Sequence, residues 1–306
     1  MNTPDTELVL QRGDARLVVS PYGASLRGLT QGRQIVATGY TGAKAKVGGE
    51  GDVLIPFPGR VAGGRYRFAG QTYQMEKTDH EGPNAIHGFL RHTLWDVPAQ
   101  SADAVTFTTA LKPSEHAGYP FVLHAEVTYH VTETGLRCQF VLENTGDGPA
   151  PVAAGFHPYF TVGSEIIDTD TLTVPFGEYL EFDDALIPTG RVLSVEGAPF
   201  DFRQPRRVGE TALNICYASP ARDENGHTAV TLRGESGRTV TVTMDDAFGY
   251  VVLYSGDPLP PGRRRTSLAI EPMTCGSDAF NHPEWGLSVL NPGDKLSGLW
   301  SVDASE

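Results

Sequence analysis

Two side chains in the sequence are candidates for proton transfer near neutral pH. His157 lies in the aromatic segment Gly-Phe-His-Pro-Tyr-Phe at residues 155–160, and Glu271 follows the apolar run at 267–270. The reference pKa of a histidine is about 6.5 and that of a glutamate about 4.3, so the two can serve as general acid and general base. More than a hundred positions separate them, and spacing alone leaves open whether they meet.

Both residues also have a plain structural interpretation. His157 can be a core histidine hydrogen-bonded to the backbone, placed on or beside a strand because Pro158 favours an extended conformation before it. Glu271 is expected in a buried strand, just before a proline, Pro272, that breaks the hydrogen-bond ladder. A buried carboxylate without a partner is costly, so Glu271 should be either paired or functional.

Two further candidates lie where strand-like runs meet glycine or proline. Arg60 ends Pro-Phe-Pro-Gly-Arg at 56–60, and His87 lies in Asn-Ala-Ile-His-Gly at 84–88. Binding residues often gather at such loop edges on a rigid scaffold. Taken alone, however, Arg60 would be a surface arginine capping a turn and His87 a turn histidine.

The elements that must position these residues are predicted to be strands. Apolar and polar residues alternate over 121–131 and again over 136–142, and the turn at 132–135 contains a glycine, which together indicate an antiparallel hairpin. Other β-rich runs occupy residues 7–10, 15–19, 34–37, 239–244 and 249–254.

The predicted fold is all-β: a large antiparallel β-sandwich formed by one domain over residues 1–306. No long segment has helical periodicity, and 35 glycines and 22 prolines spread along the chain fit many turns. No repeat, low-complexity tract or change in composition marks a second domain.

Charge and composition exclude several classes of protein. A net charge of −13 argues against a nucleic-acid partner, and the short basic run at 263–265 is interpreted as a solvated turn. Three widely spaced cysteines indicate neither a disulfide framework nor a zinc site. No signal peptide or membrane-spanning window is visible, so we expect a cytoplasmic protein, a monomer or homodimer, that does not interact with membranes.

The succession of motifs resembles the aldose 1-epimerase (galactose mutarotase) family over nearly the whole chain. The motifs occur in the order of the family: those at 56–60, 64–73, 84–88 and 155–160, then Phe-Asp-Phe-Arg at 200–203, Glu-Pro at 271–272, Asp-Ala-Phe-Asn at 278–281 and Leu-Asn-Pro-Gly-Asp at 290–294. Each motif is weak evidence alone, but the series is specific.

The resemblance implies the galactose mutarotase-like supersandwich and an enzyme that interconverts the α and β anomers of an aldose. It implies Glu271 as the base, His157 as the acid, and Arg60 and His87 in contact with the sugar. It also implies that neither a metal nor another cofactor is needed. A nearby Glu271 is expected to raise the pKa of His157.

One position departs from the family pattern and leaves the substrate open. Asn214 stands where many members carry an aspartate that binds a sugar hydroxyl, and an amide both donates and accepts hydrogen bonds. Alternatives are a mutarotase for an anionic sugar (a sugar phosphate or sulfoquinovose, held by Arg65, Arg91 or Arg263) and a non-catalytic carbohydrate-binding sandwich. A glycoside hydrolase ranks lower, because the site implied by the resemblance has one carboxylate. Tyr159 or Trp95 is expected to cover an apolar face of the sugar.

Overall fold

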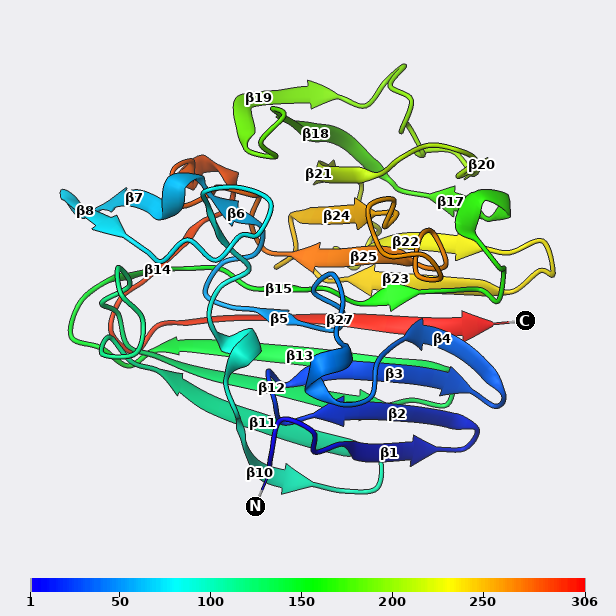
Figure 1. Ribbon diagram of the computed structural model, residues 1–306, viewed down its shortest axis with the longest axis horizontal. Helices are drawn as coiled ribbons and strands as arrows, with labels where there is room; N and C mark the ends of the chain where they lie inside the picture. The colour runs from blue at the N-terminus through cyan, green and yellow to red at the C-terminus, as the bar shows by residue number, and fades with distance from the viewer. Residues whose placement is uncertain (1, 306) are drawn as a thin grey trace.

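The computed structural model describes residues 2–305, and within this range the chain forms strands and short 3-10 turns but no α-helix. Two large antiparallel sheets, of 12 and 9 strands, contain most of the strands (Figure 1). The all-β prediction is confirmed. Within residues 2–305, no helix has the length and apolar character needed to cross a bilayer.

The larger sheet follows the order β1 (Leu8–Arg12), β2 (Ala15–Ser20), β3 (Ser25–Gln31), β4 (Gln34–Thr38), β16 (Tyr159–Phe160), β25 (Leu268–Met273), β24 (Tyr250–Tyr254), β21 (Asn214–Pro220), β18 (Phe176–Phe182) and β19 (Pro188–Ser194). Two short strands extend it: β15 (Gly155–Phe156) pairs with β25, and β5 (Val53–Leu54) pairs with β15.

The second sheet follows the order β10 (Asp96–Gln100), β11 (Ala104–Leu111), β12 (Leu123–Val131), β13 (Gly135–Asn144), β27 (Lys295–Ser305), β23 (Thr239–Met244), β22 (Thr228–Arg233), β17 (Thr171–Thr173) and β20 (Arg206–Arg207). Three two-stranded sheets pair β14 (Ala150–Val152) with β26 (Ser288–Leu290), β6 (Arg60–Val61) with β9 (Ala85–Ile86), and β7 (Arg65–Phe68) with β8 (Gln71–Gln74). The 3-10 turns are η1 (Ala43–Ala45), η2 (Ala62–Gly64), η3 (Leu90–His92), η4 (Ile167–Thr169) and η5 (Pro283–Trp285).

The predicted hairpin is confirmed as β12 and β13, which pair in register from Leu123 opposite Asn144 to Val131 opposite Leu136. Every second residue of each strand is buried, as the alternation of apolar and polar residues predicts. The strands predicted near the N-terminus and at 239–254 are also present, as β1, β2, β4, β23 and β24.

The inner faces of the two sheets share one core, so the architecture is a β-sandwich. Phe156 of β15 lies against Phe140 and Trp300 of the facing sheet, with ring centroids 5.9 and 5.4 Å apart. The hydroxyl of Tyr129, on β12, donates a 2.9 Å hydrogen bond to the carbonyl oxygen of Ala24 between β2 and β3. The contacts of Phe156 hold the strand that leads directly to His157.

The predicted break of the hydrogen-bond ladder at Pro272 is present on one side of β25 only. The strand runs through Pro272 to Met273 and pairs with β24 along this stretch. On the other side, the amides of Ile270 and Thr274 donate to the carbonyl oxygens of Pro158 and Ala154, and Pro272, which has no N–H, lies between them opposite Phe156. The ladder is therefore interrupted there without ending the strand.

His157 lies opposite Glu271 in this register, because Gly155 pairs with Met273 and Tyr159 pairs with Ala269. The amide of His157 donates to the carbonyl oxygen of Asp52 on its other side, and its carbonyl oxygen accepts from the amide of Gly51. The register therefore places the His157 side chain next to the Glu271 side chain.

Loss of the Phe156 ring should destabilise the sandwich strongly, because its buried side chain packs against Phe140 and Trp300 of the facing sheet. We expect Phe156→Ala to lower the free energy of unfolding by about 3–5 kcal/mol, measured by urea denaturation. Val289→Ala, at a position that is 50% exposed, is the matched control and should change it little. Equal effects of the two substitutions would contradict this view of the core.

Candidate active site

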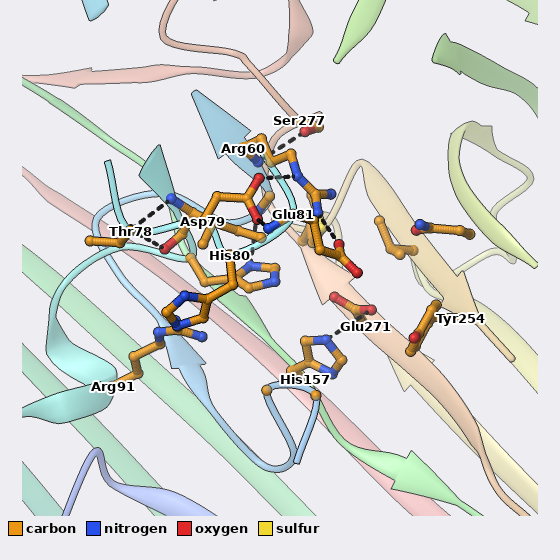
Figure 2. A pocket seen from close by; sticks show the side chains of 18 of the residues that line it. Arg60, Thr78, Asp79, His80, Glu81, Arg91, His157, Tyr254, Glu271 and Ser277 are labelled. Atoms are coloured by element: carbon orange, nitrogen blue, oxygen red, sulfur yellow. Dashed lines mark hydrogen bonds and ion pairs between the residues drawn. The ribbon is translucent and has the colours of Figure 1, made fainter. Parts of the chain in front are cut away.

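A pocket of about 430 Å³ opens over the central strands of the larger sheet, and Figure 2 shows the side chains around it. All five residues predicted from the sequence line it: Arg60, His87, His157, Asn214 and Glu271. They come from β6, the loop after β9, the segment between β15 and β16, β21 and β25. The structure thus brings together residues spread over more than 200 positions, and their roles remain predictions.

His157 and Glu271 form the central pair of the pocket. Nε2 of His157 lies 3.4 Å from Oε1 of Glu271, and both side chains are almost completely buried (Figure 2). Nδ1 of His157 has no hydrogen-bond partner among the described residues. Because Nε2 and the carboxylate lie side by side in the lining of the pocket, a proton can pass between them.

The His157 ring is held by packing on both sides. The Tyr159 ring stacks on it with centroids 5.1 Å apart, and the Tyr159 hydroxyl donates a 2.8 Å hydrogen bond to the carbonyl oxygen of Gly48. Gly49 lies against the ring with a φ of 75°, and a Cβ there would be 2.9 Å from Cδ2 of His157. Only glycine allows the backbone to approach the imidazole so closely in this conformation.

Burial controls the proton affinity of the pair. Loss of water, with smaller contributions from the nearby cations Arg91 and Lys46, lowers the pKa of His157 to about 3. Burial also raises the pKa of Glu271 well above its ordinary value, partly opposed by Arg60. The expectation that Glu271 raises the pKa of His157 is therefore wrong, because desolvation of the imidazolium outweighs attraction to the carboxylate.

Arg60 is the polar anchor at one end of the pocket. Its Nε donates to Oδ2 of Asp79 at 2.7 Å, and Nη2 donates to Oε2 of Glu81 at 2.6 Å (Figure 2). Its backbone amide donates to the hydroxyl of Ser277. Two carboxylates therefore hold one guanidinium in place, so the expectation of a site with a single carboxylate is incomplete.

His87 is fixed as a neutral ring with a defined tautomer. Its Nδ1 accepts a 3.2 Å hydrogen bond from the amide of Gly59, so the ring proton belongs on Nε2. Burial lowers the pKa of His87 well below its ordinary value, with a further contribution from His157. The backbone of His87 has a φ of 61°, an unusual conformation for a residue other than glycine that orients the ring edge-on to His157.

The wall opposite the loops consists of side chains from neighbouring strands. Asn214 on β21 pairs in register with Tyr254 on β24, and both line the pocket together with Phe182. The two aromatic residues predicted to cover the sugar are placed elsewhere. Trp95 is in the core, and Tyr159 supports His157 from behind rather than lining the pocket.

Lys46 and Arg91 line the other end of the pocket and share one buried carboxylate, that of Asp52. Arg91 is one of the three arginines that the sequence offers for an anionic sugar. The other two lie outside this pocket: Arg65 is exposed on β7, and Arg263 pairs with Glu50.

Sequence reasoning missed the polar residues Lys46, Asp52, Asp79, His80 and Glu81. Two signals point to all of them except Lys46: acidic residues inside the glycine-rich run 48–52, and the polar run 78–81 ahead of a glycine. Within residues 2–305, no group of three or more His, Cys, Asp or Glu side chains could hold a metal ion.

Comparison with known proteins identifies the family. The model of the family described as aldose 1-epimerase matches residues 6–301. The chain therefore belongs to the aldose 1-epimerase family and is an isomerase.

Named relatives and solved structures agree with this assignment. The protein YihR of Escherichia coli (strain K12) is 32% identical over 89% of this chain and 85% of its own length. Human galactose mutarotase is 26% identical over 80% of this chain and 75% of its own. A GalM/aldose epimerase homologue from C. elegans has the same fold, with a TM-score of 0.87 at 22% identity, covering 98% of this chain and 99% of its own.

The protonation state of His157 is directly measurable in the free protein. Because burial lowers its pKa to about 3, the imidazole should remain neutral from pH 8 down to pH 5, whereas a solvated histidine would be half protonated near about pH 6.5. Nitrogen-15 chemical shifts of labelled histidines would report this state, with His157→Asn used to assign the signal. A His157 resonance that titrates near pH 6.5 or above would contradict it.

Proposed function

We propose that the protein interconverts the α and β anomers of a free aldose by opening and closing the sugar ring. Glu271 takes the proton from the C1 hydroxyl while His157 gives a proton to the ring oxygen, and the C1–O5 bond breaks. Rotation about C1–C2 presents the other face of the aldehyde, and closure reverses both transfers. The observation that carries the proposal is the buried contact of 3.4 Å between two proton-transferring groups in the pocket.

The reaction requires that the pair carry one proton in total. Burial favours that proton on Glu271 with a neutral His157, whereas ring opening in the proposed direction needs Glu271 ionised and His157 protonated. These two forms differ only in the position of the proton, so they have the same pH dependence. Sugar hydroxyls at the pair, together with Arg60, would stabilise the ionised carboxylate and move the proton to His157.

The remaining predicted residues are suited to hold the sugar. Arg60 is oriented by its two carboxylates and presents further N–H groups to the pocket. His87 can donate from Nε2 because Nδ1 is occupied by the amide of Gly59. Asn214 can donate to or accept from a hydroxyl, so it can serve in place of the aspartate of many family members.

Removal of either proton-transferring group should abolish most of the catalysis. We expect Glu271→Gln and His157→Asn each to lower kcat by at least about 100-fold, the usual contribution of a general acid or base. The measurement is the change in optical rotation of freshly dissolved α-D-glucose and α-D-galactose, compared with the spontaneous rate, for variants that remain folded. Folded variants that retain full activity would contradict the proposed roles, and a wild type that accelerates no sugar would favour a non-catalytic binding protein.

Crowding the His157 ring should lower the rate without removing any catalytic group. In Gly49→Ala the new Cβ would lie 2.9 Å from Cδ2 and 3.1 Å from Nε2 of His157. Gly197→Ala is the matched control, because Gly197 has nearly the same φ, 76° against 75°, and no described atom would lie within 4 Å of its new Cβ. We expect Gly49→Ala alone to reduce kcat by about tenfold or more, since small misplacements of catalytic groups cost that much. Equal rates for the two variants would argue against this.

A further inference from the structure

The two ends of the pocket differ in charge. At one end, Lys46 and Arg91 share the single carboxylate of Asp52, with Nζ of Lys46 2.8 Å from Oδ1 and Nη1 of Arg91 3.3 Å from Oδ2. The Asp52 side chain is completely buried, whereas both cations reach the pocket. One positive charge therefore remains uncompensated within this group of three residues.

The opposite end has the reverse balance. There Arg60 is bound by two carboxylates, those of Asp79 and Glu81, which leaves one negative charge in excess. Glu81 is more than half exposed, so it borders the opening of the pocket. An anionic group on a ligand would be repelled from the Arg60 end and attracted to the end formed by Lys46 and Arg91.

The cationic end lies beside His157 rather than beside Glu271. The side chain of Asp52 binds both cations, and its backbone carbonyl oxygen accepts a hydrogen bond from the amide of His157. Figure 2 shows Arg91 on the side of His157 that faces away from Glu271 and Tyr254. The influence of Arg91 and Lys46 on the pKa of His157, and of Arg60 on that of Glu271, agrees with this placement.

The direction of the reaction connects this end with one part of the sugar. In the proposed function, on which this inference rests, His157 protonates the ring oxygen O5 and Glu271 acts on the C1 hydroxyl. O5 is bonded to C5, and in a hexose C5 carries C6. The part of the sugar beyond O5, away from C1, therefore lies towards Lys46 and Arg91.

We propose that the natural substrate is a hexose with an anionic group on C6, which is bound by Lys46 and Arg91. Each cation gives one hydrogen bond to Asp52 and has further N–H groups for an oxyanion. His92 also lines this end, and burial lowers its pKa to about 4, so it adds a neutral hydrogen-bonding group. A carboxylate, a phosphate and a sulfonate share the chemistry that this arrangement recognises.

The first test compares sugars that differ at C6, using the wild-type protein. D-Glucose, 6-deoxyglucose and D-xylose would be compared with glucuronate, glucose 6-phosphate and the 6-sulfonate of 6-deoxyglucose, which also separates the three anions. We expect kcat/KM for at least one anion to exceed that for glucose by about tenfold or more, the scale of a charge-assisted hydrogen bond. The advantage should shrink as salt is added, because the charges reach solvent.

The second test uses Lys46→Met and Arg91→Met, each of which leaves Asp52 with one cation. We expect each to lower the ratio of kcat/KM for the preferred anion to that for glucose by about tenfold, mainly through KM. Arg65→Met removes a cation that lies outside the pocket and should leave the ratio unchanged. Thermal unfolding of each variant would confirm that it is folded.

Three results would overturn the inference in distinguishable ways. If the protein accelerates neutral sugars but no C6 anion better than glucose, the anionic substrate is wrong and the proposed function stands. If the two variants slow glucose and the anion equally, Lys46 and Arg91 have only a structural role. Acceleration of no sugar at all would overturn the proposed function itself, and this inference with it.

Discussion

The register of residues 155–160 against β25 is the constraint on which the pocket depends. This segment pairs with β25 at Gly155 and again at Tyr159, so His157 lies directly opposite Glu271. The backbone of His157 is held on its other side by bonds to residues 51 and 52. The His157 and Glu271 side chains therefore meet over the centre of the sheet.

Burial of this contact has a chemical consequence. Neither the imidazolium of His157 nor the carboxylate of Glu271 would be well solvated, so burial lowers the pKa of His157 and raises that of Glu271. The pair therefore favours a form without charge, in which the two side chains share one proton. Tyr159 and Gly49 hold the ring, and the Gly59 amide fixes the tautomer of the neighbouring His87. The scaffold thus supplies a proton donor and acceptor in fixed positions, which is what ring opening of an aldose requires.

The sequence predicts the strands, the sandwich and five of the residues that line the pocket, because alternation and local motifs carry that information. It predicts the backbone at Pro272 only in part, because β25 continues along β24 on one side of the proline. It also misses the Lys46–Asp52–Arg91 group, since only the fold brings these segments together. The sequence predicts the pKa of His157 in the wrong direction because the depth of its burial is a property of the tertiary structure.

The central claim is that burial makes His157 and Glu271 a pair that works with one shared proton. The most direct test is the pH dependence of kcat/KM for anomer interconversion of D-glucose. The pair gains its second proton only near pH 3, because burial lowers the pKa of His157 to about 3 while it raises that of Glu271, so kcat/KM should be nearly as high at pH 4 as at pH 6. Two groups with ordinary pKa values would instead lose about half of kcat/KM by about pH 4.3, and such a loss in the folded protein would contradict the claim.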